Sequence, residues 1–404
     1  MSAALDQAAR AAAGRVIAAL AARFRDLDLA EEAFSEACLA AARAWPQAGV
    51  PTDPAAWLYR VAYRQALDEI RRRGVRSRLA PDPPEPPPSA EERLADEAQL
   101  IPDERLRLIF VCCHPAIAPE ARAALTLRLV CGLPAQEIAA AFLVPTPTLL
   151  QRLTRAKRKI ADAGVPFEVP GPDAWAERLE AVLTTLEIAY AKAHADAAGS
   201  GPYAGFAAEV LQLTGALVEM LPAEGEALGL AALVRYAEAR RPARLDARGL
   251  MVPLAEQDPA LWSRRLIAAG DAFLHRASNL GAYGPRALTA AIHGLWCSRR
   301  SLADPAPWAE VLALYDVMLV VRDDVVVRLN RAVALAEVEG AAAALAEVDR
   351  LAEPRTQEFQ PWHAVRADLL RRLGRLDESR AAYDDAMRLA PGPAERGWLA
   401  ARRP

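Results

Sequence analysis

Apolar residues recur at intervals of three and four along almost the whole of this 404-residue chain, and few stretches alternate between apolar and polar residues. An interval of three to four matches one turn of an α-helix, whereas a half-buried strand needs strict alternation. Alanine, leucine, arginine and glutamate, which favour helices, dominate the sequence. The sequence therefore predicts an all-α protein.

Prolines and glycines divide this helical pattern. The stretch from Arg78 to Ala90 holds six prolines and no apolar periodicity, which predicts an extended, semi-rigid tether. A second cluster of proline and glycine spans residues 165–172. We therefore expect a three-helix domain over residues 1–75, a proline-rich acidic linker over 76–98, a domain of four short helices over 99–165 and a separate helical module over 172–404.

The first domain should begin with two amphipathic helices, over residues 16–24 and 30–45, followed by a rigid loop and a third helix over 54–73. Asp28 is placed to cap the second helix. Glu31 and Glu32 follow in its first turn, where acidic side chains suit the helix dipole.

The composition excludes several classes of protein. With 53% hydrophobic residues the chain can form buried cores, so general disorder is not expected. No apolar run approaches the ~20 residues of a membrane span, and the N-terminus lacks the features of a secretion signal. Five irregularly spaced cysteines do not form a disulfide framework. We expect a cytoplasmic protein without membrane contact.

Charge is distributed unevenly, although 49 basic and 52 acidic residues give a net charge of only −3. Residues 54–80 carry seven arginines and two acids, and residues 146–160 carry five basic residues and no acid. Between them, residues 81–104 carry eight acids and one arginine. Two basic blocks separated by an acidic linker indicate two contacts with nucleic acid, whereas either block alone could be solvated surface.

Residues 131–160 have the pattern of a helix-turn-helix. Thr146 is placed to cap the second helix and Pro147 to begin it. Its buried stripe should be Leu149, Leu153, Ala156 and Ile160, so that the opposite face shows Thr148, Gln151, Arg152, Arg155 and Lys159. The first three could reach base edges in the major groove and the last two could meet phosphates. The alternative is an ordinary antiparallel helix pair.

Aromatic and basic residues interleave on the third helix of the first domain. Trp57, Tyr59 and Tyr63 stand among Arg60 and Arg64. Aromatic rings beside cations suit unstacked bases held by their phosphates, so Arg60, Tyr63 and Arg64 are candidate contacts to single-stranded DNA. Core packing is the better explanation of Trp57.

An enzymatic function is not indicated. Cys112, Cys113 and His114 are adjacent, but neighbouring thiols on one helix do not converge on a tetrahedral ion, and no second pair stands at a ligand spacing. The other histidines are scattered, and there is no glycine-rich phosphate loop. We therefore expect no catalytic residue, no metal and no cofactor.

The C-terminal module contains a repeat-like segment. Residues 374–391 place Gly, a small residue, an aromatic residue, Ala and Pro at the spacing of a tetratricopeptide repeat. A weaker copy surrounds residues 330–348, with Gly340 between its helices. Since one repeat cannot bury its own face, we expect degenerate helix pairs stacked beside it, the alternative being an irregular helical domain.

These motifs together resemble the sigma factors of bacterial RNA polymerase of the extracytoplasmic-function type. The resemblance covers the whole chain and is closest to a subfamily with a long C-terminal tetratricopeptide-like extension. It rests on residues 29–37, 57–72, 101–115, 124–129 and 142–160, and in the extension on 240–244, 256–262, 314–316 and 329–334.

The resemblance implies that the first domain is sigma region 2, which binds core polymerase and melts the minus-ten promoter element. Residues 29–37 are similar to the polymerase-binding helix, which assigns polymerase contacts to Glu31, Glu32, Phe34 and Glu36. The helix after Trp57 is similar to the promoter-reading helix, which adds Arg71 and Arg72 to the DNA contacts. The loop at residues 47–53 would hold a flipped base.

The resemblance further implies that the helix-turn-helix is sigma region 4, which binds the minus-thirty-five element. The expected function is promoter-specific initiation of transcription, with core RNA polymerase and promoter DNA, double-stranded and melted, as partners. The C-terminal module would regulate activity, be required for it, or dock against the rest of the chain. The alternative function is that of a stand-alone helix-turn-helix regulator or repeat scaffold that does not engage polymerase.

Overall fold

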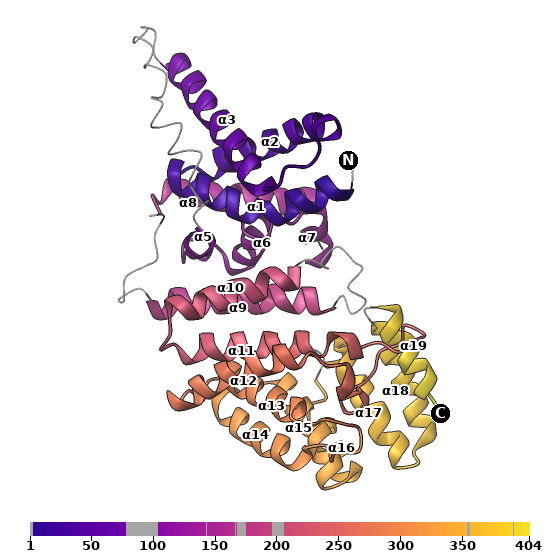
Figure 1. Ribbon diagram of the computed structural model, residues 1–404. Helices are drawn as coiled ribbons and strands as arrows, with labels where there is room; N and C mark the ends of the chain where they lie inside the picture. Colours follow the sequence, from indigo (N-terminus) through magenta and orange to yellow (C-terminus); the bar gives the residue numbers. More distant parts are fainter. Residues whose placement is uncertain are drawn as a thin grey trace. The chain divides into compact units, whose positions relative to one another are not determined.

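The computed structural model describes residues 3–77, 104–142, 144–165, 167, 175–195, 206–353, 356–390 and 392–404. Within these ranges the regular elements are helices, and the only β pairing is an isolated bridge between Leu245 and Met251. The all-α prediction is confirmed (Figure 1). Most of the expected linker over 76–98 lies outside the described residues. None of the described helices is both long enough and apolar enough to span a membrane.

The chain forms two compact units. The first comprises Met1–Ala193 with Ala208–Leu213, and the second comprises His194–Ala207 with Thr214–Pro404. We expected instead a boundary at residues 165–172. The division falls later in the sequence because α9 (Trp175–Ala195) packs on the helix-turn-helix domain: Arg178 donates to the carbonyl of Phe110, and the Cys113 thiol lies 3.4 Å from the Thr185 hydroxyl.

The first unit begins with three long helices that pack on one another, α1 (Ala3–Phe24), α2 (Leu27–Ala48) and α3 (Pro54–Ser77). Small and aliphatic residues form their common core, including Leu20, Ala30 and Leu58, each fully buried. Helix α1 begins at Ala3, well before the expected start at residue 16, and α2 begins at Leu27 and continues past the expected loop start to Ala48, where Gly49 donates to the Trp45 carbonyl at 2.9 Å.

The predicted cap of α2 is wrong. Asp26, not Asp28, is the N-cap, and its carboxylate accepts from the Leu29 amide at 2.9 Å. The helix begins at Leu27, which places Asp28 inside the first turn with its side chain available for another partner. That partner is Lys157, from the second domain of the same unit.

Four shorter helices follow within the described residues 104–165 of the expected second domain. They are α5 (Arg105–Cys112), α6 (Pro119–Leu129), α7 (Ala135–Ala141) and α8 (Thr146–Asp162). Helix α8 packs on both α6 and α7, and it begins at Thr146. Contrary to expectation, Thr146 is not its cap: Pro145 holds that position, and it makes no side-chain capping hydrogen bond.

The second unit consists of helices that pack mainly on their sequence neighbours. Helix α10 (Phe206–Met220) contributes to both units. The longer helices that follow are α11 (Gly225–Ala239), α12 (Arg264–Asn279), α13 (Pro285–Cys297), α14 (Trp308–Val321), α15 (Val325–Val338), α16 (Ala341–Arg350), α17 (Gln360–Arg372), α18 (Leu376–Leu389) and α19 (Pro393–Arg402). Short 3₁₀ turns occur at Arg241–Ala243, Leu254–Glu256, Pro259–Leu261 and Thr356–Glu358.

The repeat-like segment forms a helix pair, α17 and α18. Gly374 stands between the two helices with φ +75°, a left-handed conformation that favours glycine. Ser379, Ala382 and Tyr383 on α18 are buried, and the Ser379 hydroxyl donates to the Ala367 carbonyl of α17 at 2.9 Å. The small and aromatic residues of the motif therefore pack the two helices together.

Candidate nucleic-acid interface

Helix α8 has one buried and one exposed face. Leu149, Leu153, Ala156 and Ile160 are buried, as the sequence predicts. Gln151, Arg155 and Lys159 are exposed, and Thr148 and Arg152 are half-buried. At about 100° per residue these five predicted contacts fall within one face of the helix, roughly 100° wide. They share a surface that a DNA groove can reach.

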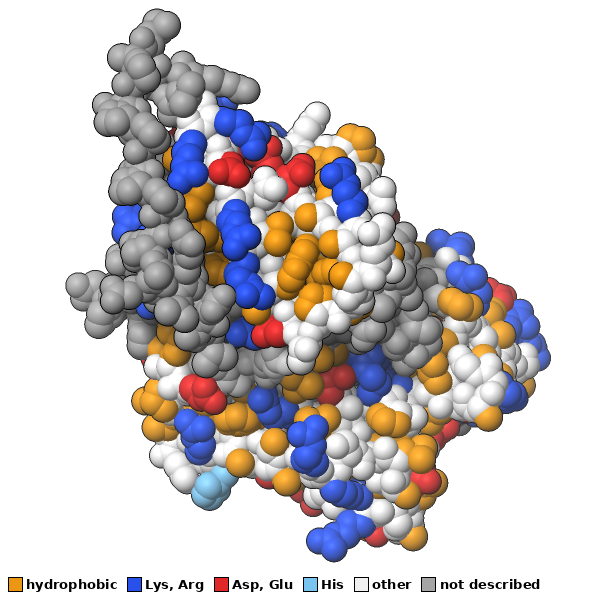
Figure 2. All heavy atoms as spheres, turned by 45° about the horizontal axis from the view of Figure 1, so that its top comes forward, with side chains coloured by type: hydrophobic (Ala, Val, Ile, Leu, Met, Phe, Trp, Pro, Cys, Tyr) orange, Lys and Arg blue, Asp and Glu red, His pale blue; other side chains and the backbone are white. Residues whose placement is uncertain are grey.

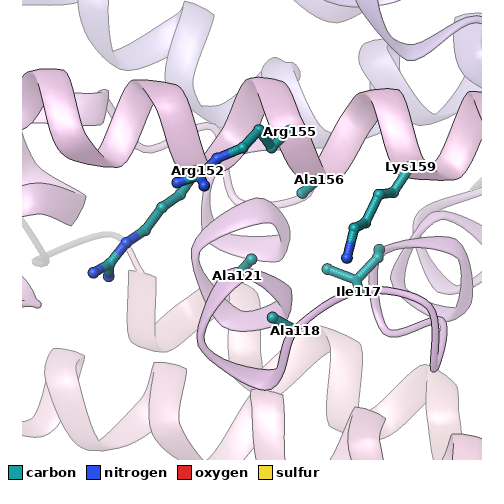
Figure 3. Close-up of a pocket in the computed structure, with 7 residues that line it drawn as sticks. All are labelled: Ile117, Ala118, Ala121, Arg152, Arg155, Ala156 and Lys159. Carbon is teal, nitrogen blue, oxygen red and sulfur yellow. The ribbon is translucent and has the colours of Figure 1, made fainter.

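The basic side chains of this face border a pocket of about 480 Å³ (Figure 3). Arg152, Arg155 and Lys159 line one side, and Ile117 and Ala118, just before α6, lie on the other. In Figure 3 the Lys159 side chain points toward Ile117, whereas that of Arg152 extends away from it. The pocket thus has an apolar floor and a cationic rim, which suits a phosphate backbone lying against the helix.

The cations of this rim are available for a ligand. Neither Arg152 nor Lys159 has a hydrogen-bond or ion-pair partner among the described residues, and the only bond of Arg155 runs from its Nε to the Gln151 carbonyl at 3.4 Å in the same helix. Unpaired cations on an exposed helix face add positive potential without an internal counter-charge. That arrangement favours binding to a polyanion.

A second group of cations lies on α3. Arg60 and Arg64 are exposed and have no ion-pair partner within the described part of the chain. Figure 2, in which the end of the molecule bearing α2 and α3 is turned toward the viewer, shows Lys and Arg side chains spread over this face with a few acidic ones among them. Arg71 and Arg72, farther along α3, are exposed but paired with Asp68 at 3.6 Å and Glu69 at 3.4 Å.

The aromatic residues of α3 are partly used in packing. The Tyr63 ring lies 5.5 Å from that of Phe24 and 6.0 Å from that of Tyr59, measured between centroids. Trp57 meets Trp45 edge to face at 5.5 Å, which agrees with the packing interpretation of Trp57. Tyr63 is half-buried in this cluster, so part of its side chain remains accessible on the helix that also carries Arg60 and Arg64.

The four residues assigned to polymerase contact differ in exposure. Phe34 is only 9% exposed and lies in the core, where it supports the packing of α2. Glu36 is exposed and has no partner among the described residues, whereas Glu32 is exposed and meets Arg73 at 3.3 Å. Glu31 is half-buried, because two cations of the second domain hold its carboxylate.

These two cations, Arg128 of α6 and Lys157 of α8, were not singled out in the sequence. Arg128 approaches Glu31 at 2.6 Å, and Lys157 approaches Glu31 at 3.1 Å and also bonds Asp28. Burial lowers the pKa of Lys157, but the hydrogen bond to Asp28 and the charge of Glu31 outweigh it and raise the pKa above its ordinary value. The sequence signal that could have identified Lys157 as a contact to another element is its position on α8 outside the predicted DNA face.

The cysteines near residue 112 do not form a reactive site. Cys112 and Cys113 are fully buried in the packed interior of the second domain. Burial raises the pKa of Cys113 to about 11 and that of Cys112 well above its ordinary value, so both remain protonated thiols at neutral pH. Among the described residues, no cluster of three or more His, Cys, Asp or Glu side chains could hold a metal ion.

Comparison with known protein families assigns both domains of the first unit. Residues 9–76 match sigma-70 region 2, and residues 107–160 match sigma-70 region 4. Residues 178–278 match a family of unknown function, DUF6596. The two sigma regions thus fall on the two domains that carry the basic surfaces of α3 and α8.

The similarity extends over almost the whole chain in one relative. Over 402 residues the chain is 40% identical to the uncharacterized protein R00370 of Rhizobium meliloti (strain 1021). The aligned region covers 98% of this chain and 94% of that protein. No solved structure matches. In sequence order, region 2, region 4 and DUF6596 match residues 9–76, 107–160 and 178–278 of this chain.

Proposed function

This chain belongs to the sigma-70 family, with the domain set of an extracytoplasmic-function-like sigma factor, and from that premise we propose that it binds core RNA polymerase and directs it to specific promoters. Its sigma domains indicate a transcription factor rather than an enzyme. Polymerase would supply the chemistry, and this chain would supply promoter choice and strand opening in the cytoplasm.

The observation that carries this proposal is the cationic face of α8. Arg152 and Lys159 have no internal partner among the described residues, and they project from the second helix of a helix-turn-helix. In this motif the N-terminal part of the second helix enters the major groove. Thr148, Gln151 and Arg152 would then contact base edges of the minus-thirty-five element, and Arg155 and Lys159 would contact phosphates.

Region 2 would supply the second DNA contact. Arg60 and Arg64, with the accessible part of Tyr63 on the same helix, suit the phosphates and an unstacked base of the melted minus-ten element. Arg71 and Arg72 would have to exchange their exposed ion pairs for phosphates, which is inexpensive because exposed pairs contribute only ~0–1 kcal/mol. Glu32 and Glu36 of α2 would face polymerase.

The extension would regulate this activity or be required for it. The helix pair formed by α17 and α18 supports a tetratricopeptide-like module, because its motif residues pack as that repeat requires. We assign a binding role to the second unit, because stacked helix pairs of this kind present extended surfaces to partners.

Run-off transcription with core polymerase on a library of promoter fragments tests the proposal. We expect discrete start sites that share two upstream elements. The variant Arg152→Ala should lose these starts, and Arg158→Ala, on the same helix but outside its DNA face, should retain them. DNA binding without any polymerase-dependent transcript would instead support a stand-alone regulator.

A further inference from the structure

Helix α14 of the second unit carries an exposed apolar stripe. Its members follow one side of the helix at intervals of three and four and are Ala309, Ala313, Val317, Val320 and Val321. At about 100° per residue these side chains fall within an arc of roughly 120°. Val320 is 87% exposed, and Val317 and Val321 are 44% and 47% exposed. Because valine is among the residues most often buried, a row of exposed valines indicates a surface that binds a partner.

The opposite side of α14 supplies the contacts that hold this helix in its unit. Val311, Leu312 and Met318 are buried, and Met318 packs in one cluster with Leu288 of α13 and Val327 of α15. Helix α14 packs on α13 and α15 and lies at the outer edge of the second unit (Figure 1). The valine stripe is therefore left over from the packing of the described helices.

The stripe is complementary to itself, because its small and large residues lie at opposite ends. Ala309 and Ala313 belong to the first half of α14, and the three valines belong to the second half. If two copies of the helix pair antiparallel about a two-fold axis near Asp316, each Val320 comes within about 1.5 Å of the level of Ala313 in the other copy, measured along the helix axis. A parallel pair would instead set valine against valine and leave a gap between the alanines.

The charges at the two ends of α14 are complementary in the same arrangement. Glu310 is exposed on the side of the stripe and has no hydrogen-bond or ion-pair partner among the described residues. Arg322, which ends the helix, is 53% exposed and pairs with Asp324 at 2.6 Å. Glu310 and Arg322 both stand about 9 Å along the chain axis from Asp316. Antiparallel pairing therefore places Glu310 of each copy level with Arg322 of the other.

We propose that the exposed stripe of α14 is a homodimer interface, in which the helix pairs antiparallel with α14 of a second copy of this chain. In a two-fold dimer the same surface patch is used by both copies, so it must complement itself in shape and charge. A helix of this length is roughly 21 Å long, and one such face is smaller than the ~1,600 Å² of a standard interface. We expect a weak dimer that dissociates on dilution. It would form whether or not the chain binds polymerase, because it uses the second unit alone.

Sedimentation velocity of the full chain between about 1 and about 100 µM, the range in which a small interface dissociates, measures this equilibrium. Val320→Asp should raise the dissociation constant about tenfold or more, because dimerisation would then bury an unpaired charge against apolar side chains. The side chain of Val320 is 87% exposed, so its replacement should leave the fold of the monomer intact.

Leu376→Asp is the matched control. Leu376 is 42% exposed and is the first residue of α18, where an acidic side chain suits the helix dipole. It introduces the same charge at an exposed apolar position outside the stripe and should leave the dissociation constant unchanged. Glu310→Gln should weaken the dimer by a smaller factor than Val320→Asp, and its effect should shrink as salt screens the pair with Arg322.

Cysteine cross-linking tests the orientation of the two helices. The background is Cys38→Ser, because the other four cysteines are buried. Chains with Ala313→Cys and chains with Val320→Cys are mixed and treated with diamide. Antiparallel pairing predicts a disulfide between the two variants and little within either variant alone, where the matching residues lie about 9 to 12 Å apart along the axis.

A chain that stays monomeric over the whole concentration range would overturn the proposal and assign the stripe to a different protein. A dimer that Val320→Asp leaves unchanged would overturn it as well, because the contact would then lie elsewhere on the chain. Efficient cross-linking within either cysteine variant alone would refute the antiparallel arrangement. Each of these results is independent of run-off transcription, so a failure of the proposed function would be recognised separately.

Discussion

The substitution Lys159→Gln isolates a phosphate contact on α8. Lys159 is exposed, stands on the same face as Thr148 and Arg152, and has no ion-pair partner among the described residues. Its removal therefore breaks no internal interaction that the structure describes. Any loss of DNA affinity would come from the lost contact with DNA and not from unfolding.

The magnitude follows from counterion release. Each phosphate neutralised on duplex DNA contributes about −0.9 to the slope of log affinity against log salt. Lys159→Gln should reduce the slope by about that amount. Over a fourfold rise in salt, from about 50 to about 200 mM, one contact corresponds to a factor of about 3.5 in affinity. The defect of the variant should thus be about 3.5 times larger at the low salt concentration than at the high one.

Fluorescence anisotropy with a labelled duplex measures this slope directly, and it requires no knowledge of the promoter sequence because phosphate contacts are independent of sequence. Arg158→Gln is the matched control, since this arginine carries the same charge but lies about 100° from Lys159 around the helix, beyond the edge of the face formed by the five predicted contacts. Equal slopes for the Lys159 variant and the unsubstituted chain would refute the placement of Lys159 against DNA.

Three further predictions concern other parts of the chain. Arg152→Ala should cost ~1 to 3 kcal/mol on a selected promoter fragment and much less on a scrambled one, and an unchanged footprint would remove Arg152 from the contacts. A chain ending at residue 170 should melt at a lower temperature than one ending at residue 195, because only the longer chain retains α9 and its bond from Arg178 to the Phe110 carbonyl; equal melting temperatures by calorimetry would contradict this. Desolvation and the adjacent charge of Arg240 hold the pKa of His293 well below its ordinary value. Below about pH 6.5 the unfolded chain therefore binds a proton at this histidine that the folded chain does not bind. The free energy of unfolding then falls by up to about 1.4 kcal/mol for each pH unit. His293→Gln keeps an acceptor for Arg240 and should flatten the decline in melting temperature between pH 7 and 5, whereas parallel profiles would rule out this histidine as its cause.

Several helices of the first unit, though not the start of α1 at Ala3, were predictable because their signals are local. The stripe of Leu149, Leu153, Ala156 and Ile160 is set by helical periodicity alone, and the structure buries all four. The exposed face of α8 follows from that stripe by geometry. The same reasoning locates the start of α3 at Pro54, because proline is favoured in the first turn of a helix.

Contacts between domains were not predictable in this way. Asp28 has the residue type and approximate position of a helix cap, yet Asp26 takes that role and Asp28 meets Lys157, which is distant in sequence. Nothing in the local pattern distinguishes the two aspartates. The pairing of Arg128 with Glu31 likewise depends on how region 4 packs on region 2, which short-range periodicity does not encode.

The packing of α9 on the first unit was likewise not predictable from local sequence patterns. A cluster of proline and glycine before it resembles a domain boundary, and such clusters do interrupt helices. An interruption of the chain does not decide which core the next helix joins, however. Arg178 donates to the Phe110 carbonyl of α5, and Thr185 lies beside Cys113, the residue that follows α5, so α9 completes the region 4 side of the first unit even though most of it belongs to the DUF6596 segment.

The cations of α8 consequently fall into two sets with different expected effects. Lys159 and Arg152 lie on the face that we predict to contact DNA, and Lys157, roughly 180° from Thr148 around the helix, pairs with carboxylates of α2. Neutralising the first set should weaken promoter binding, whereas neutralising Lys157 should break ion pairs with α2 and leave the predicted DNA face unchanged. The charge of the helix is therefore informative about mechanism only when each face is altered separately.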